Sequence, residues 1–448
     1  MLNYDTLLSD QVKKMKPSGI RKFFDLAAMM EGVISLGVGE PDFQTPWTVR
    51  KAAVDSLERK RMVYTANSGM ADLRKEICHY LNRKYHLTYH PENETLVTVG
   101  GSEAIDLAIR ATVNPGDEVL IVEPSFVCYK PIVELMHGVA VPISTKLKNK
   151  FKLTPEELRS HITERTKMLI LPYPNNPTGG IMTREDLEAI AEVLRDTNIL
   201  VLSDEIYSEL TYGRKHVSIA EIDGMWERTI YVSGFSKAFA MTGWRLGYVC
   251  APEPIAKQML KIHQYAIMSA PTLSQYAAIV ALRECDQEVQ KMVDEYNRRR
   301  RMLVDGFNRI GLTCFNPEGA FYMFPCIRST GMTSEEFCET LLQEEKVAVV
   351  PGNAFGESGE GFVRVSYAYS LKHLQEALVR IERFVQRHQG KINASSNQNG
   401  SGKNQSGAGY YRHSCRRVSP SGNRVSGSFY CGHGDSCPDG ITGNHTDL

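Results

Sequence analysis

The chain has 448 residues, of which 42% are hydrophobic and 23% are charged, and its 52 Lys and Arg residues balance its 52 Asp and Glu residues. This composition excludes an intrinsically disordered chain, a collagen-like repeat and a small disulfide-rich protein. At roughly 150 residues per domain, the length predicts two or three domains with sizeable cores. A net charge of zero gives no general reason to expect a nucleic acid or a membrane as a partner.

The amino-terminal residues carry no continuous apolar stretch and no cleavage-site pattern, so the sequence predicts no secretory signal. No run approaches the ~18 apolar residues that a membrane-spanning helix needs. Both features favour a cytoplasmic protein. Seven cysteines are scattered through residues 1–390 without a C-x-x-C pair, which predicts buried thiols in preference to a disulfide framework or a metal site.

Up to about residue 285, apolar strand-like runs alternate with amphipathic helical stretches. This alternation predicts an α/β fold with a mostly parallel sheet and helices on both faces. In such sheets, ligands bind at the carboxyl ends of the strands. In chain order, the pattern predicts strands at 96–99, 118–122, 167–172, 199–202 and 229–232, and helices at 103–112, 155–162 and 183–196.

The pattern changes from about residue 286 onward. A long charged helix, short strands and a final helix are predicted at 286–310, 321–324, 347–350, 361–365 and 371–389. This order predicts a smaller α+β domain. Residues 391–448 then hold 10 Gly, 10 Ser and 6 Asn with no helical or strand period, so we expect a disordered tail there. The Cys and His residues of this tail have spacings that fit no standard zinc finger.

Several unusual residues follow directly after predicted strands. Lys237 lies among small and aromatic residues after the strand at 229–232. It is either an exposed loop lysine or a half-buried one with a lowered pKa, whose neutral amine can attack a carbonyl. Arg245, eight residues further on and framed by glycines, suits an anion.

Three further motifs fit the same edge of the sheet. Asp204 ends a strand, where an aspartate often contacts a metal or a cofactor, and no other metal ligands accompany it. Asn176 lies in a Pro-rich motif that could also be a plain turn. Gly100, Gly101 and Ser102 open a helix, and a helix N-terminus can bind an anion.

The order and spacing of these motifs resemble the class I aminotransferases, which are pyridoxal-phosphate-dependent enzymes of fold type I, over about residues 18–387. The matched motifs are V-G-E-P-D-F at 38–43, Tyr64 with Gly69, G-G-S at 100–102, P-N-N-P-T-G at 174–179, S-D-E-I-Y at 203–207, S-G-F-S-K-A-F-A-M-T-G-W-R-L-G at 233–247, and Arg364. Within this class the chain is similar to the bacterial aspartate/aromatic subgroup, including aminotransferase A-like proteins of bacilli, through residues 16–22 and 203–212.

The resemblance implies a domain organisation. It predicts an N-terminal segment over 1–46 that joins the small domain, a large pyridoxal-phosphate-binding domain over 47–285, a small C-terminal domain over 286–390 and the tail over 391–448. It also implies a homodimer with a shared active site, because Tyr64 corresponds to a residue that reaches the cofactor phosphate of the neighbouring subunit.

The resemblance further implies roles around the cofactor ring. Lys237 would bond the cofactor aldehyde and later move the proton at the substrate α-carbon. Asp204 would keep the pyridine nitrogen protonated, so that the ring can accept electrons. Tyr207 and Asn176 would donate to the ring 3-oxygen, and Phe126 would stack on the pyridine face.

For the phosphate, the expected donors are the glycine turn and one arginine, at Gly101, Ser102 and Arg245. Position 234 often carries a phosphate-binding hydroxyl in the family and is Gly here, so Ser236 or Ser233 would replace it. Arg364 alternates with apolar residues on a predicted strand, and its planar fork would bind the substrate α-carboxylate with the backbone of Gly39. Asn176 is also an expected substrate contact, and Ile20 and Phe23 would line the side-chain pocket.

The predicted reaction moves the amino group of an L-amino acid of aspartate or aromatic type to a 2-oxo acid such as 2-oxoglutarate, in ping-pong order. A C–S β-lyase of the same fold stays open, since it would share Lys237, Asp204 and Arg245. Arg364 argues against a decarboxylase. A non-catalytic regulator would need a helix-turn-helix segment, and a dehydrogenase would need a G-x-G-x-x-G motif after the first strand; the sequence predicts neither.

Overall fold

The computed structural model describes residues 2–17, 19, 27–59 and 62–398, and for residues 389–398 it describes the backbone alone. The central sheet has seven strands in the order β2-β8-β7-β6-β5-β3-β4. Neighbouring strands from β7 to β4 are parallel, whereas β8 runs antiparallel to both β7 and β2. The strands are β2 (Thr95–Thr98), β3 (Glu118–Glu123), β4 (Val139–Ser144), β5 (Thr166–Leu171), β6 (Leu200–Asp204), β7 (Thr229–Gly234) and β8 (Gly247–Cys250).

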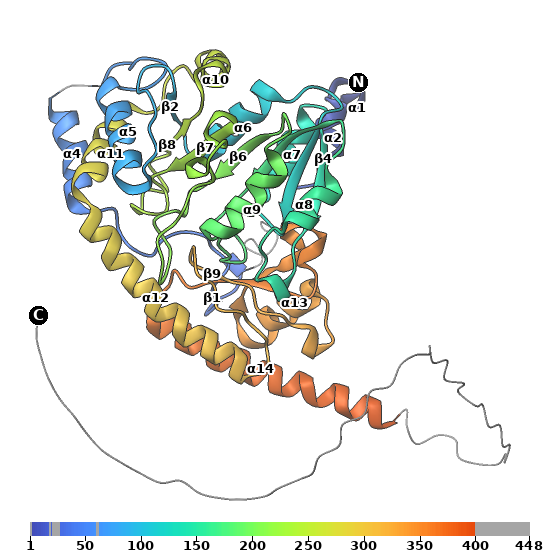
Figure 1. Cartoon of the computed structure of the whole chain (residues 1–448). Helices are drawn as coiled ribbons and strands as arrows, with labels where there is room; N and C mark the ends of the chain where they lie inside the picture. Colours follow the sequence, from blue (N-terminus) through green and yellow to red (C-terminus); the bar gives the residue numbers. More distant parts are fainter. Residues whose placement is uncertain (1, 18, 20–26, 60–61, 399–448) are drawn as a thin grey trace, which may run out of the picture. The chain divides into compact units, whose positions relative to one another are not determined.

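Helices cover both faces of this sheet, which explains why its strands are apolar on both sides (Figure 1). Successive side chains of a strand point to opposite faces. In β3, Val119 and Ile121 pack with one group of helices, whereas Leu120 and Val122 pack with the other. The first group is α6 (Gly101–Thr112), α7 (Tyr129–Leu135) and α10 (Glu253–Ala266), and the second is α8 (Pro155–His161) and α9 (Arg184–Leu194).

A larger core lies beside β2, β7 and β8. It joins inward-facing strand residues such as Tyr231 and Tyr248 to α5 (Ala71–Tyr85) and α11 (Thr272–Glu284), with α4 (Trp47–Glu58) packed on α11. The same core continues along α12 (Asp286–Arg309) into the C-terminal part of the chain. This long helix therefore connects the large sheet to the smaller one through one continuous core (Figure 1).

The smaller part holds a three-stranded antiparallel sheet in the order β11-β12-β9 and a parallel pair formed by β1 and β10. Its strands are β1 (Ile34–Ser35), β9 (Tyr322–Met323), β10 (Val347–Ala348), β11 (Val350–Pro351) and β12 (Val363–Ser366), and its helices are α13 (Ser334–Glu345) and α14 (Leu371–Gln398). Helix α13 begins with a capping box, in which Thr333 and Glu336 each accept the backbone N–H of the other.

The amino-terminal residues contact both parts. Two short helices, α1 (Tyr4–Leu7) and α2 (Asp10–Lys14), come first, and Gln11 donates a hydrogen bond to the carbonyl oxygen of Glu134 on α7 at 3.3 Å. Further along, β1 pairs with β10 of the smaller part. Among the described residues, the seven body cysteines are free thiols and no helix is long and apolar enough to cross a membrane.

The final helix is longer than the sequence predicts. Helix α14 continues to Gln398, so residues 391–398, which composition assigned to the disordered tail, are helical. The stretch Lys391–Gln398 contains neither Gly nor Pro and simply extends an established helix, which costs little once the helix is nucleated. Residues 399–448, with the tail's cysteines, lie outside the described part of the chain.

Candidate active site

A cavity of about 730 Å³ lies where the carboxyl ends of several central strands face the smaller sheet. Its wall includes residues that follow β3, β5 and β7, the last residue of β6, and the first turn of α6. From the smaller part come side chains of β9 and β12. The predicted site residues in this wall are Gly39, Gly101, Ser102, Phe126, Asn176, Asp204, Tyr207, Ser236, Lys237, Arg245 and Arg364.

Three predicted site residues, Tyr64, Ile20 and Phe23, are not among the described residues of this wall. Tyr64 is 82% exposed and lies outside the cavity of its own chain. Ile20 falls outside the described residues, as does Phe23, so the proposed side-chain pocket is described only in part.

Lys237 follows β7 and is partly buried in the cavity wall. Its Nζ donates a hydrogen bond to the carbonyl oxygen of Gly39 at 2.7 Å. Burial lowers the pKa of Lys237 from 10.5 to about 8; Glu40 opposes this shift, and the positive charge of Arg364 adds to it. About a tenth of the amine is therefore neutral at pH 7 and about half at pH 8, which suits a nucleophile or a base.

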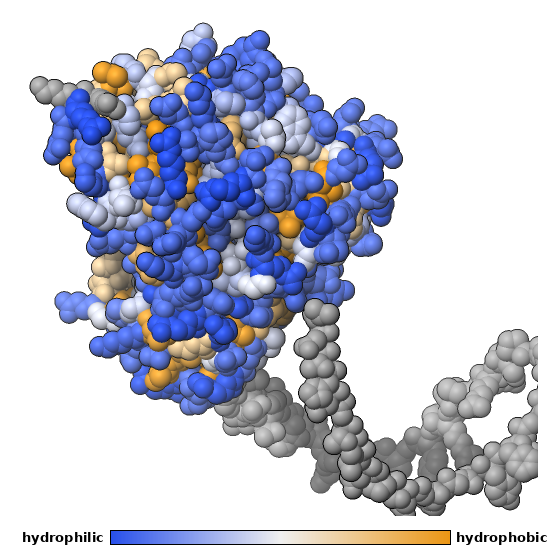
Figure 2. Space-filling view, turned by 60° about the vertical axis from the view of Figure 1, so that its left-hand side comes forward, coloured by the Kyte–Doolittle hydropathy of each residue, from blue (hydrophilic) through white to orange (hydrophobic). Residues whose placement is uncertain are grey.

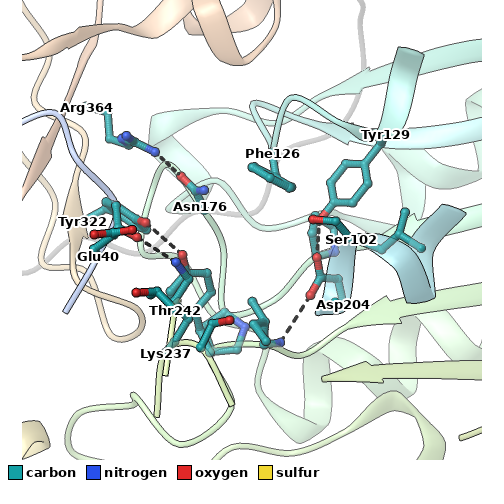
Figure 3. Close-up of a pocket in the computed structure, with 18 of the residues that line it drawn as sticks. Glu40, Ser102, Phe126, Tyr129, Asn176, Asp204, Lys237, Thr242, Tyr322 and Arg364 are labelled. Carbon is teal, nitrogen blue, oxygen red and sulfur yellow. Dashed lines mark hydrogen bonds between the residues drawn. The ribbon is translucent and has the colours of Figure 1, made fainter. Parts of the chain in front are cut away.

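Asp204 is buried at the end of β6, and two donors hold its carboxylate. The hydroxyl of Tyr129 donates to Oδ2 at 2.6 Å, and the backbone N–H of Ile206 donates to Oδ1 at 3.3 Å (Figure 3). Burial raises the pKa of Asp204, and these hydrogen bonds oppose the rise. The carboxylate is thus fixed in direction and ready to pair with a protonated group in the cavity.

Arg364, on β12, lies on the side of the cavity opposite to Asp204 (Figure 3). Its guanidinium donates to Oδ1 of Asn176 at 2.9 Å and to the carbonyl oxygen of Gly37 at 2.5 Å. It lies over the rings of Tyr322 and Phe355, 4.6 and 4.7 Å from their centroids. Its buried Nε has no hydrogen-bond partner among the described residues, and burial lowers the pKa of the side chain. An anionic partner would stabilise this buried cation by pairing with its charge and its free donor.

Two tyrosines connect these groups. The hydroxyls of Tyr207 and Tyr322 share a hydrogen bond of 2.8 Å. Nζ of Lys237 lies 6.0 Å from the ring centroid of Tyr207, so this phenol and the amine border the same space. Phe126 lines the wall nearer to Ser102 and Tyr129 (Figure 3).

The first turn of α6 and Arg245 meet closely at one end of the cavity. Gly100 has φ of +81°, and a Cβ there would lie 2.6 Å from Nη2 of Arg245. A Cβ at Gly247 would lie 2.5 Å from the carbonyl carbon of Gly100. These glycines let the guanidinium approach the helix N-terminus, and the result is a cradle for an anion such as a phosphate.

The missing hydroxyl at position 234 has a steric explanation. A Cβ at Gly234 would lie 2.9 Å from the Cα of Gly247, where the two strands β7 and β8 pass each other. The hydroxyl of Ser233 donates to the carbonyl oxygen of Glu205 at 3.3 Å, and this residue is not among those that line the cavity. Ser236 does line it, and it is the better placed of the two candidates.

Sequence reasoning missed several cavity residues: Glu40, Ile105, Tyr129, Thr242 and Tyr322. Glu40 lies in the motif at 38–43 and Thr242 in the motif at 233–247. Both motifs were predicted to belong to the site, but these two residues were given no role. Tyr129 and Tyr322 had no local signal, because each reaches the cavity only through tertiary packing.

Comparisons with known proteins agree with this site. The family model for aminotransferase class I and II matches residues 31–381. YugH of Bacillus subtilis, which bears an aminotransferase name, is 55% identical over 84% of this chain and 98% of its own length. An aspartate aminotransferase of Pyrococcus abyssi is 45% identical, again over 84% of this chain and 98% of the relative. The crystal structure of an aromatic aminotransferase from Pyrococcus horikoshii matches with a TM-score of 0.79 at 42% identity, over 82% of this chain and 99% of that one.

The fold and the comparisons together define a fold type I transferase. The chain belongs to the class I and II aminotransferases and is a pyridoxal-phosphate-dependent transaminase. Its cavity fits that cofactor, because a semi-buried lysine, a buried aspartate and an anion cradle all border one space.

Proposed function

We propose that this transaminase takes an L-amino acid of aspartate or aromatic type and transfers its amino group to a 2-oxo acid such as 2-oxoglutarate. The convergence of Lys237, Asp204 and Arg364 on one cavity is the observation that carries the proposal. Pyridoxal 5′-phosphate supplies the aldehyde that takes up the amino group and the ring that accepts electrons from the substrate α-carbon.

The cavity residues would act on different groups of the substrate and of the cofactor. Arg364, which Asn176 and the Gly37 carbonyl orient, would bind the α-carboxylate with its planar fork. Lys237 would hold and return the α-carbon proton, since its lowered pKa lets the amine act in both directions near neutral pH. Asp204 would hold a proton on the ring nitrogen, with Tyr129 fixing the direction of its carboxylate.

The remaining roles follow the same geometry. The turn at Gly101 and Ser102, together with Arg245 and Ser236, would bind the phosphate. Tyr207 would donate to the ring oxygen, since its hydroxyl lies in the cavity wall within hydrogen-bonding distance of Tyr322. Phe126 and Asn176 would contact the ring as the family resemblance predicts.

The donor class rests on relatives and on the lining. The Pyrococcus relatives named above carry aspartate and aromatic names. In the described lining, the three cations are Lys237, Arg245 and Arg364, and each has a role toward the cofactor or the α-carboxylate. Apolar side chains such as Phe126 and Ile105 leave room for an aromatic ring. Cytoplasmic localisation remains a prediction of the sequence.

We also propose that two copies form a dimer through the surface around Tyr64. Val63 and Tyr64 are exposed next to Tyr265 and Met268, and hydrogen bonds from Asn67 and Thr272 hold the two segments together. Figure 2, which brings the side of α4 and α5 forward, shows hydrophobic patches on a mostly hydrophilic face. A second copy would cover the exposed side chains of Val63, Tyr64, Tyr265 and Met268. It would also bring each Tyr64 to the partner's cofactor.

The test is an absorption spectrum of the purified protein, recorded before and after excess L-aspartate, L-phenylalanine or L-glutamate. A cofactor band near ~400 nm that shifts toward ~330 nm identifies an accepted donor, because these bands follow the cofactor's amino state. A band that none of the three shifts contradicts the donor class. Release of pyruvate and ammonia from cystathionine without any added 2-oxo acid would instead indicate a β-lyase.

A further inference from the structure

A buried acid and imidazole pair lies directly behind the anion cradle. Glu103 is in the first turn of α6, two residues after Gly101, and its side chain is 11% exposed. His263 on α10 is fully buried, and its Nδ1 lies 2.6 Å from Oε1 of Glu103. Because an ionised carboxylate only accepts, Nδ1 is the donor.

The other carboxylate oxygen holds the strand that enters the turn. Oε2 of Glu103 accepts the backbone N–H of Val99 at 2.5 Å. Thr98, one residue earlier, donates through its hydroxyl to the carbonyl oxygen of Gly100 at 2.9 Å. The chain between β2 and α6 is therefore fixed on both sides of Gly100, where Arg245 approaches.

The geometry points to a positioning role for the pair. We infer that Glu103 and His263 fix the turn whose N–H groups face the cofactor phosphate, and that cofactor affinity depends on their hydrogen bond. The inference rests on the proposed placement of the phosphate at Gly101 and Ser102. With both oxygens of Glu103 engaged by donors, its carboxylate is held in one position beside the turn.

Helix α10 contributes the second donor because it packs along α6 in the same core. Without His263, one oxygen of a largely buried carboxylate would lack a partner. Glu103 would then turn toward another donor or toward water, because an unpaired buried charge is costly. In either case the anchor on Val99 loosens, and the N–H groups at the start of α6 lose their fixed direction.

The experiment compares two ligands on the cofactor-free protein: pyridoxal 5′-phosphate and pyridoxal, which lacks the phosphate. For Glu103→Ala and His263→Leu, we expect the dissociation constant of pyridoxal phosphate to rise roughly tenfold or more. The dissociation constant of pyridoxal should stay within about twofold, since its ring contacts do not involve the turn. Absorbance or fluorescence titration measures both constants without any turnover.

Conservative variants separate the hydrogen bond from general packing. His263→Asn places an amide donor where Nδ1 lies, so we expect it to restore most of the phosphate preference that His263→Leu loses. Asp106→Ala is the matched control, because Asp106 lies on α6 but forms an exposed ion pair with Arg110 at 2.7 Å. It should bind both ligands as the wild type does.

The outcomes distinguish the pair from the phosphate site itself. If the wild type binds pyridoxal as tightly as its phosphate ester, the placement of the phosphate is wrong, and the inference fails with it. If the wild type prefers the phosphate ester but His263→Leu keeps that preference, only the positioning role is overturned. The same holds if His263→Asn behaves like His263→Leu. Should Glu103→Ala not fold, the two His263 variants carry the comparison.

Discussion

At the scale of single residues, the site depends on how the protein shifts the proton affinity of two groups on neighbouring strands. Asp204 ends β6, and Lys237 follows β7, the strand beside it. Both groups are charged in water at neutral pH, and burial opposes both charges. Burial raises the pKa of the acid Asp204 and lowers the pKa of the base Lys237. Each pKa therefore moves closer to neutral pH, where a group can both release and accept a proton.

For Lys237 this gives a measurable pH dependence. We expect the amine of the cofactor-free protein to react with trinitrobenzenesulfonate at a rate that is half-maximal near pH 8, because burial lowers its pKa to about 8. Ordinary lysines reach half their maximal rate only near pH 10. Peptide mapping by mass spectrometry follows the site, and Lys237→Arg should remove the fast-reacting residue. A half-maximal rate at pH 10 or above would show that the amine is not perturbed.

For Asp204 the variant Asp204→Asn separates charge from shape. The amide oxygen still accepts the hydrogen bond of the Tyr129 hydroxyl, and only the longer bond from the Ile206 N–H at 3.3 Å is lost, so we expect the melting temperature to change by no more than a few degrees. The turnover number should fall by on the order of 100-fold or more, since the side chain can no longer hold a proton on the ring nitrogen. Asp106→Asn is the control for both measurements, because the Asp106 side chain is 30% exposed and does not line the cavity. Retention of more than a tenth of the activity would argue against this role.

At the scale of elements, the two parts of the chain meet at the end of β3. Glu123, its last residue, packs against Gly356 in the loop that follows β11. Two residues further along the chain, Ser125 donates its backbone N–H to the carbonyl oxygen of Phe355 at 3.0 Å. Burial raises the pKa of Glu123 to about 7; Lys130 lowers it and Glu357 raises it further. This contact therefore responds to pH.

The sign of that response is fixed by linkage. The folded protein holds the proton of Glu123 up to about pH 7, whereas the unfolded chain releases it near 4.5, so raising the pH between these values destabilises the folded state. We expect Glu123→Gln to increase the free energy of unfolding at pH 8 by on the order of 1–3 kcal/mol and to have little effect at pH 5. Urea unfolding at both pH values measures this, with the exposed Glu188→Gln as control. An equal effect at both pH values would rule out the titration of Glu123 as its cause.

At the scale of the whole molecule, the proposed dimer makes each active site depend on two chains. Tyr64 is 82% exposed and is not among the residues that line the cavity of its own chain. In a dimer its hydroxyl would reach the partner's cofactor. The arrangement can be tested by complementation, because a defect in Lys237 and a defect in Tyr64 would then belong to different chains of one site.

We expect Lys237→Ala and Tyr64→Ala to be nearly inactive alone and to recover activity when they are refolded together. Random pairing makes half of the dimers mixed, and one of the two sites in each mixed dimer is intact. The recovered activity should therefore approach about a quarter of the wild-type value. No recovery above the separate variants would place Tyr64 in its own chain's site or outside any site.

The fold was predictable where local pattern carries it. The five predicted central strands are present, because burial on both faces leaves a continuous apolar run. Strand β4 was missed, since it lies at the edge of the sheet and only Ile143 among its residues is buried. Strand β8 was missed because its first residue, Gly247, belongs to the glycine-containing motif at 233–247, which hides the start of a short apolar run.

By itself the sequence determined the family, five of the seven strands of the central sheet and the edge at which the functional motifs collect, because these properties reside in runs of neighbouring residues. Only the tertiary structure decided which side chains meet. Arg364 contacts Asn176 across 188 residues, and Tyr129 contacts Asp204 across 75. The structure also decided between the two alternatives for Lys237 and gave the direction of the pKa shift of Asp204, since both depend on burial, which many distant residues create together.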